Sequence, residues 1–209
     1  MGTIKNGRQS GKVGKTVTYL LNGKLVTRTI GKSTKPASDL QNAVRQRTKL
    51  TSKFLQTLKE FILVGYELDA RQFKELPQNQ AFRYNWKHAS AGSYPRIRIN
   101  FSKVLLAFGS MPLPKGLTVV ASEGGFNFSW AVQEGLSGTH WSDQVMLVAY
   151  FPALKRAAYR TAGVARYEGT DLLPIFDIAH GVVAETYIAF ISNDRKSISN
   201  SVYTGKVTW

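Results

Sequence analysis

Apolar and polar residues alternate in two short runs near the start of the chain, TVTYLL and KLVTRT, which flank Asn22 and Gly23. Both central residues of a type I′ turn need positive φ, and an Asn-Gly pair adopts that conformation easily. The pattern predicts a β-hairpin over residues 16–30. Residues 1–15 are rich in Gly and Lys and predict an extended arm in front of it.

From residue 39 to residue 64 the apolar positions recur at helical spacing, which predicts one long amphipathic helix with Ser38 or Asp39 as its N-cap. The apolar sector consists of Leu40, Ala43, Val44, Phe54, Leu55, Leu58, Phe61 and Ile62. Arg45, Lys49 and Lys53 fall on the opposite side. Arg47 projects into the apolar sector, so it should reach out to solvent, or form a buried ion pair or one at an interface.

Beyond Gly65 a second, shorter helix is predicted over residues 76–90. After it, apolar residues recur at every second position. Short alternating runs separated by Gly, Pro, Asn and Asp continue from Pro95 to the end, which predicts a β-sandwich or barrel. These runs are RIRINF, KVLLAF, LTVVAS, FNFSWAV, QVMLVAYF, RAAYRTAG, DLLPIF, AETYIAFIS and SVYTGKV. The expected architecture is mainly β with an α-helical N-terminal part, divided into residues 1–94 and residues 95–209.

The composition suits one large domain, or one domain with an appendage: 209 residues, 43% of them hydrophobic, form a packed core without difficulty. The absence of cysteine excludes disulfides and thiolate metal sites. Neither an apolar run of membrane-spanning length nor a signal peptide is visible. We therefore expect synthesis in the cytoplasm, with release as part of a secreted assembly left open.

The net charge of +15 is concentrated in the first part of the chain. Residues 1–60 hold 13 Lys and Arg against 2 Asp and Glu, residues 61–120 hold 8 against 3, and residues 121–209 hold 7 against 8. This gradient predicts a basic module that meets an anionic partner and a nearly neutral module that folds on itself. The expected contacts to that partner are Arg8, Lys15, Lys24, Arg28, Arg45, Lys49 and Lys53.

The stretch GRQSGKVGKT contains the residues of a phosphate-binding loop but not its pattern. Counting back from Gly14, Lys15 and Thr16, the first glycine of the motif falls at Gln9. The predicted hairpin that follows also lacks the helix N-terminus that binds phosphate. We therefore expect no nucleotide site here.

Catalytic patterns are weak throughout the chain. His88, His140 and His180 lie in separate segments without a second ligand at helical spacing, and no G-x-S-x-G motif occurs. Asp171, Asp177, Glu185 and Asp194 have the pattern of a solvated face. We expect no enzyme activity, no cofactor, no metal and no small-molecule substrate.

Residues 117–207 resemble a fibronectin type III-like sandwich. FNFSWAV with Trp130, QVMLVAY with Tyr150, the Leu173-Pro174 pair, ETYIAFIS with Tyr187 and the closing SNSVY are similar to its strands B, C, E, F and G. The resemblance implies a core Trp on strand B, a core Tyr on strand F, and a spacer or recognition role. An immunoglobulin-like topology remains the alternative.

The whole chain also resembles an uncharacterised bacterial family of basic proteins of about this size, a domain-of-unknown-function family. The matching stretches are I-K-N-G with S-G-K-V-G, VRQRTKLTSKFL, YPRIRINFSKVLLAFGSM, YIAFIS and SNSVYTG. This resemblance implies no activity.

Two functions fit these observations. The first is a non-enzymatic structural subunit of a virion, tail, filament or fibre, a homo-oligomer or larger assembly, in which the arm and hairpin dock on neighbouring subunits by strand addition. The docking residues would be Ile4, Lys5, Gly7, Gly11, Lys12, Val13 and Gly14. The second is non-specific nucleic-acid binding by the basic arm and helix face. Tyr19 is the only aromatic residue before Phe54, so stacking platforms are not expected.

Overall fold

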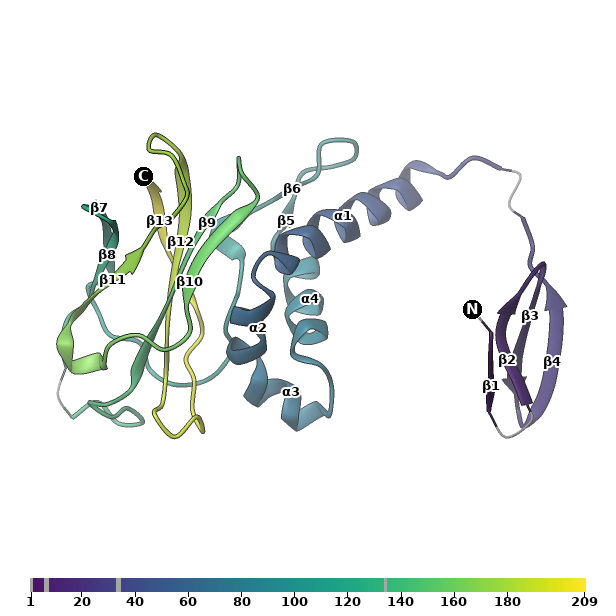
Figure 1. Ribbon diagram of the computed structural model, residues 1–209, viewed down its shortest axis with the longest axis horizontal. Helices are drawn as coiled ribbons and strands as arrows, with labels where there is room; N and C mark the ends of the chain where they lie inside the picture. Colours follow the sequence, from purple (N-terminus) through teal and green to yellow (C-terminus); the bar gives the residue numbers. More distant parts are fainter. Residues whose placement is uncertain (1, 6–7, 33–34, 134) are drawn as a thin grey trace. The chain divides into compact units, whose positions relative to one another are not determined.

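The computed structural model describes residues 2–5, 8–32, 35–133 and 135–209, without the side chains of Ile4, Lys5, Arg8 and Gln9. Contacts divide the chain into two compact units, residues 1–38 and residues 39–209 (Figure 1). The boundary predicted from the sequence lies at residue 94 instead. The structure places the helices and the later strands in one unit because they share one hydrophobic core.

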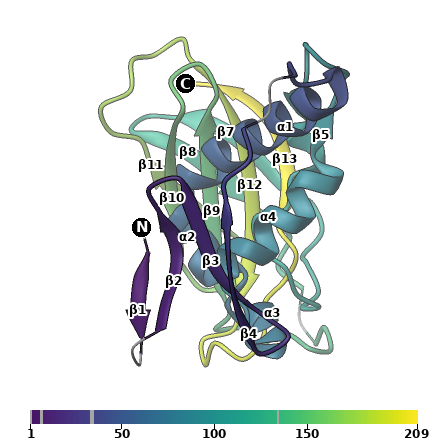
Figure 2. The ribbon, with the colours of Figure 1, turned by 90° about the vertical axis from the view of Figure 1, so that its right-hand side faces the viewer.

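The first unit is a four-stranded antiparallel sheet in the order β1-β2-β3-β4 (Figure 2). Its strands are β1 (Thr3–Lys5), β2 (Arg8–Val13), β3 (Thr16–Leu21) and β4 (Lys24–Thr29). The predicted hairpin is confirmed: β3 pairs with β4, and φ is 49° at Asn22 and 79° at Gly23. Positive φ at both positions is what a type I′ turn requires.

The expectation of an extended arm over residues 1–15 is wrong, because this segment forms β1 and β2. Strand β2 pairs with β3, and β1 pairs with β2. Gly11 and Gly14 have φ of 97° and 57°, and glycine adopts positive φ without steric cost. Gly14 and Lys15 connect two antiparallel strands, a context that differs from the strand-to-helix turn of a phosphate-binding loop.

The second unit begins with four helices, α1 (Asp39–Gln56), α2 (Lys59–Gly65), α3 (Glu67–Phe73) and α4 (Pro77–His88). The predicted second helix is confirmed by α4, which has Pro at its first position. The single helix predicted over residues 39–64 is wrong, because it breaks between α1 and α2. The backbone nitrogens of Thr57 and Leu58 donate three residues back, to Phe54 and Leu55, and the Thr57 hydroxyl also donates to the Phe54 carbonyl. This tightened turn changes the direction of the helix.

Two antiparallel sheets follow. One has the order β10-β9-β12-β13 and the other the order β11-β8-β7. The bounds are β7 (Thr118–Ser122), β8 (Gly125–Ser129), β9 (Gln144–Phe151), β10 (Arg156–Arg160), β11 (Thr170–Pro174), β12 (Val183–Ile191) and β13 (Val202–Thr208). A short ribbon of β5 (Ser90–Ala91) and β6 (Arg98–Ile99) precedes them, and 3-10 turns cover Phe101–Lys103 and Arg166–Glu168.

The strand predicted from KVLLAF does not form. Instead, side chains satisfy the backbone of this buried segment. The Asn85 side chain accepts from the Leu105 nitrogen and donates to the Leu105 carbonyl, at 3.0 and 2.8 Å. The hydroxyl of Tyr66 also donates to that carbonyl, and Ser201 Oγ accepts from the Leu106 nitrogen. Because these backbone groups already have partners, the segment needs no neighbouring strand.

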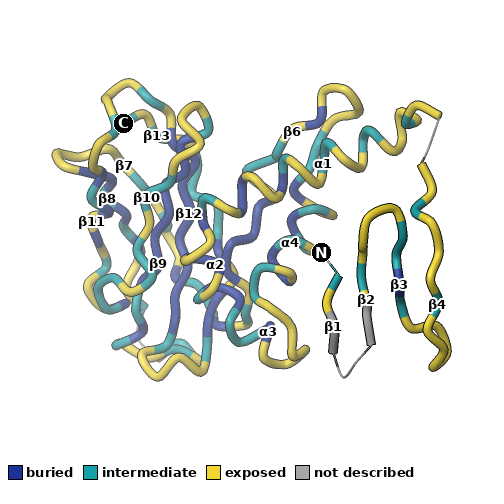
Figure 3. Tube along the Cα trace, turned by 45° about the vertical axis from the view of Figure 1, so that its right-hand side comes forward, coloured by how far each residue is buried: buried dark blue, intermediate teal, exposed yellow. Residues whose placement is uncertain are grey.

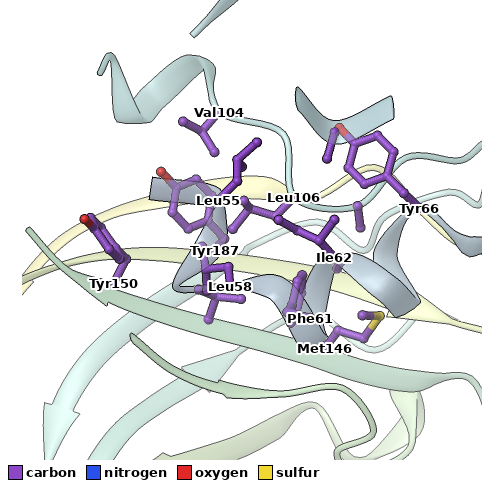
Figure 4. Close-up of a cluster of buried hydrophobic side chains, with 14 of the residues drawn as sticks. Leu55, Leu58, Phe61, Ile62, Tyr66, Val104, Leu106, Met146, Tyr150 and Tyr187 are labelled. Atoms are coloured by element: carbon purple, nitrogen blue, oxygen red, sulfur yellow. The ribbon is translucent and has the colours of Figure 1, made fainter. Parts of the chain in front are cut away.

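The sheet β10-β9-β12-β13 is covered on both faces, by helices on one side and by the sheet β11-β8-β7 on the other (Figure 1). On β9 and β12, the residues that face the helices are Met146, Val148, Tyr150, Tyr187, Ala189 and Ile191. Figure 4 shows Met146, Tyr150 and Tyr187 together with side chains of the helices. Those that face the other sheet are Val145, Leu147, Ala149, Phe151, Ala184, Ile188 and Phe190. The two central strands are therefore buried almost continuously (Figure 3), which is typical of a sheet between two layers.

Tyr187 lies on the helix side of β12 rather than between the two sheets, which differs from its expected position in a sandwich core. The strand alternates, so Tyr187 shares its face with Ala189 while Ile188 and Phe190 face the other sheet. Its hydroxyl donates to the Phe101 carbonyl at 2.8 Å. Burial raises the pKa of this phenol well above its usual range, so the group remains a donor.

Replacing Tyr187 by Phe should lower the free energy of unfolding by about 1 kcal/mol, because the hydrogen bond from its hydroxyl to the Phe101 carbonyl is lost and that carbonyl keeps only the Val104 nitrogen as a donor. Urea unfolding measures this change as a lower midpoint at unchanged slope. Tyr159→Phe is the matched control, because Tyr159 is partly exposed and its hydroxyl has no hydrogen bond among the described residues. Equal midpoints for the two variants would contradict a stabilising role for the Tyr187 hydroxyl.

Candidate functional site

The described side chains of the N-terminal sheet form no hydrophobic core. Among its described side chains Thr18 is the only buried one, and Val13, Leu20, Leu21 and Leu25 are 47%, 56%, 51% and 50% exposed. Residues 1–38 also contain eight Lys and Arg and no Asp or Glu. The unit therefore combines apolar surface with unbalanced positive charge.

The strand register assigns the residues of this sheet to two faces, because cross-strand partners lie on the same face. The face that we term the basic face carries Lys12, Val17, Tyr19, Leu21, Lys24, Val26 and Arg28. The opposite face, termed the leucine face, carries Val13, Thr16, Thr18, Leu20, Leu25, Thr27 and Thr29.

Side-chain contacts agree with this assignment. The Arg28 guanidinium lies 5.5 Å from the centre of the Tyr19 ring on the basic face. On the leucine face the hydroxyls of Thr18 and Thr27 are 2.9 Å apart, and Leu20 lies opposite Leu25. The two faces thus differ in chemistry: one presents cations beside an aromatic ring, and the other presents apolar groups between threonines.

The residues predicted for docking and for anionic contacts lie at several places. Gly11, Lys12 and Val13 are in β2, Gly14 and Lys15 form the turn to β3, and Lys24 and Arg28 are in β4. Ile4, Lys5 and Arg8 lie in β1 and β2, but their side chains, and the whole of Gly7, lie outside the described residues. Arg45, Lys49 and Lys53 are exposed along one side of α1. Lys12, Lys24 and Arg28 are thus the predicted cations that the sheet brings to one face.

Arg47 does not form an ion pair within the described part of the chain. Its guanidinium lies 5.0 Å from the centre of the Trp86 ring, an arrangement typical of a cation–π contact. The Trp86 indole nitrogen donates to the Thr48 hydroxyl at 3.2 Å. On the same stretch of α1, Leu40 and Val44 are 81% and 53% exposed, so the predicted apolar sector is buried only in its C-terminal part.

The three histidines lie apart in the structure. His88 contacts Tyr84 on α4, His140 contacts Ser142 through its Nδ1 at 2.7 Å, and His180 stacks on Trp209. Within the described ranges no cluster of three or more metal-ligating side chains occurs. None of the helices in those ranges combines the length and apolar character that a membrane span requires.

The prediction that four C-terminal carboxylates lie on a solvated face is wrong for two of them. Asp177 and Asp194 are exposed, whereas Asp171 and Glu185 are buried. Asp171 accepts a hydrogen bond from Arg160 at 2.8 Å, and Glu185 accepts one from the Tyr203 hydroxyl at 2.6 Å. Burial of a carboxylate requires such partners. Asp171 lies on the buried side of β11, a strand that alternates between exposed and buried residues, whereas Glu185 lies on β12, which is buried at nearly every position.

A second buried carboxylate–guanidinium pair has a structural role. The Arg166 Nε atom lies 3.5 Å from Asp143 Oδ2. The Arg166 guanidinium also lies over the Phe190 ring and donates a hydrogen bond to the Pro112 carbonyl. The Trp130 indole nitrogen donates to the Arg166 carbonyl at 2.7 Å. Burial lowers the pKa of Arg166, and the Asp143 carboxylate partly offsets the effect. The pair connects loops around the core Trp predicted for strand B.

Comparison with known proteins gives a family but no activity. No curated protein and no solved structure matches the chain. One family model, described as a family of unknown function (DUF6266), matches residues 7–205. The predicted resemblance to an uncharacterised family is confirmed by this match, which includes most of the N-terminal sheet and nearly all of the second unit. The chain therefore belongs to the DUF6266 family.

Proposed function

We propose that this protein is a non-enzymatic structural subunit of a larger assembly, in which the N-terminal sheet docks on a neighbouring subunit. The observation that carries the proposal is that the described side chains of residues 1–38 form no hydrophobic core. A sheet with one hydrophobic face needs a second layer to cover it. Here both faces expose apolar side chains, so the sheet gains stability when a partner covers at least one of them.

Charge limits the choice of partner. Residues 1–38 carry eight positive charges, and residues 39–209 hold 20 Lys and Arg against 13 Asp and Glu, a net +7. Two copies of the chain therefore repel each other at long range, whereas an acidic neighbour is attracted. Salt screens both effects. Docking between copies should strengthen as salt rises, and docking on an acidic neighbour should weaken.

We further propose that the strands from β7 to β13 form a fibronectin type III-like sandwich. The strand order supports this assignment. If β7, β8 and β11 are strands A, B and E, they share one sheet, and β9, β12 and β13, as strands C, F and G, share the other, as in sandwiches of this type. The helices that cover the second sheet depart from a simple sandwich. A spacer or recognition module suits an assembly subunit.

A second candidate function, non-specific nucleic-acid binding, is favoured by the basic face alone. Lys12, Lys24 and Arg28 lie on one side of the sheet together with Tyr19. Each Lys or Arg that neutralises a phosphate releases counterions and steepens the dependence of binding on salt. This candidate leaves the leucine face uncovered, so it explains less of the exposed apolar surface than docking on a protein does.

The double variant Leu20→Ser/Leu25→Ser should weaken assembly by about 100-fold or more, because each leucine contributes ~1.5–3 kcal/mol when it is buried in an interface. Light scattering of the purified protein measures the loss as a lower particle mass. The salt series described above then distinguishes a second copy from an acidic neighbour added to the sample.

The matched control is Val120→Ser/Leu172→Ser, which removes two exposed apolar residues from β7 and β11. It should leave the particle mass unchanged. If the Leu20/Leu25 variant keeps the mass of the original protein, or if the control loses as much, docking through the leucine face is wrong.

For nucleic acid, the triple variant Lys12→Gln/Lys24→Gln/Arg28→Gln should reduce the slope of log K against log salt by about 2–3 on a mixed-sequence duplex. Fluorescence anisotropy at several salt concentrations gives this slope. The control triple variant Arg45→Gln/Lys49→Gln/Lys53→Gln removes equal charge from α1. Binding that both triple variants reduce equally would show that net charge, not the basic face, is responsible.

A further inference from the structure

A polar cavity of ≈ 550 Å³ lies beside the helix-side face of β12 and β13, next to β6 and the 3-10 turn that follows it. It is formed wholly by residues of the second unit. Its charged and polar lining includes Arg98, Asn100, Ser102, Glu185, Tyr203 and Lys206. The volume falls within the range of about 300–1,000 Å³ that is usual for small-ligand sites.

Glu185 is the buried charge of this cavity. The residue is 3% exposed, its Oε2 accepts a hydrogen bond from the Tyr203 hydroxyl at 2.6 Å, and its Oε1 lies 3.8 Å from the Lys206 nitrogen. An ionised carboxylate accepts about four hydrogen bonds. Among the described residues Oε1 accepts none, so it keeps its capacity for a donor from outside the protein.

Tyr203 holds the carboxylate in place. Burial raises the pKa of its phenol, and the hydrogen bond to Glu185 raises it further, so the hydroxyl stays protonated and donates to Oε2. Glu185 and Lys206 are also cross-strand partners in the β12–β13 pair. These contacts leave the Oε1 atom as the acceptor that a ligand would use.

Arg98 and Lys206 supply the opposite charge. Both are exposed, and Arg98 forms no ion pair within the described part of the chain. The Lys206 side chain is 68% exposed and lies beyond hydrogen-bonding distance of Glu185. Ile99 and Phe101 add apolar surface to the same wall. The cavity thus contains a negatively charged hydrogen-bond acceptor, two positively charged hydrogen-bond donors and an apolar surface.

We propose that this cavity binds an α-amino acid as its zwitterion, with the ammonium group on Glu185 and the carboxylate on Arg98 and Lys206. A neutral sugar would be held through hydroxyls and would not require charges of both signs. A purely anionic ligand would pair with Arg98 and Lys206 but would leave the buried Glu185 Oε1 without a donor, at a cost in free energy. The apolar wall suits an amino acid with an apolar or aromatic side chain.

Three probes of matched shape test this proposal on the full-length protein: L-phenylalanine, 3-phenylpropanoate, which lacks the ammonium group, and 2-phenylethylamine, which lacks the carboxylate. Calorimetric titration should give binding of L-phenylalanine that is about tenfold or more tighter than that of either analogue, because each analogue loses a charge-assisted hydrogen bond.

Two variants locate the contacts. Glu185→Gln keeps an acceptor for Tyr203 and should remove the preference for L-phenylalanine over 3-phenylpropanoate. Arg98→Gln, at an exposed position, should reduce the preference over 2-phenylethylamine. Lys115→Gln, an exposed residue outside the cavity, should change neither. Equal binding of the three probes, no binding of L-phenylalanine, or an unchanged preference in the Glu185→Gln variant would each overturn the proposal.

Discussion

A β-sheet is stable in water when other layers cover its apolar faces, and this constraint accounts for most of the molecule. The sheet β10-β9-β12-β13 satisfies it twice, with helices on one face and the sheet β11-β8-β7 on the other. Its central strands β9 and β12 are therefore apolar at nearly every position. The helix break at Thr57, the close contact of Asn85 with the 105 backbone and the hydrogen bond from Tyr187 to the Phe101 carbonyl all belong to this covering layer.

The N-terminal sheet satisfies the same constraint on neither face within its own unit. Sheets of this kind usually need a packed hydrophobic face for independent stability, and here Leu20 and Leu25 are exposed. Its positive charge adds self-repulsion, because no carboxylate lies within residues 1–38. A partner with an apolar and acidic surface would decrease both the exposed apolar area and the repulsion between the positive charges. These two properties support the proposal that the sheet is a docking element.

Elements fixed by local signals could be predicted from the sequence. The Asn22-Gly23 turn and α4, with its initial Pro77, depend on residues close together in the chain. Features that depend on residues far apart in the chain could not be predicted from the sequence. Strands β1 and β2 have the Gly- and Lys-rich composition of a mobile arm, and they form because β3 offers an edge to pair with. The 104–107 segment lacks a strand because Asn85 and Ser201 satisfy its backbone.

In the candidate sites, too, local sequence predicted some features, and others depend on residues far apart in the chain. The charge gradient identified the basic N-terminal region, but only the register of β2, β3 and β4 brought Lys12, Lys24 and Arg28 to one face. Glu185 was predicted to lie on a solvated face, but it is buried. Strand β12 is covered on both sides, so its sequence shows no alternation that would separate an inward carboxylate from an outward one.

Amide hydrogen exchange of the purified chain at low protein concentration tests the central claim most directly. We predict that amides of β3 and β4 exchange with little protection, because their sheet has no core of its own. Amides of β9 and β12 should exchange only through global unfolding. Adding the docking partner should then slow exchange in β3 and β4 alone. Equal protection of both sheets in the isolated chain would contradict the account.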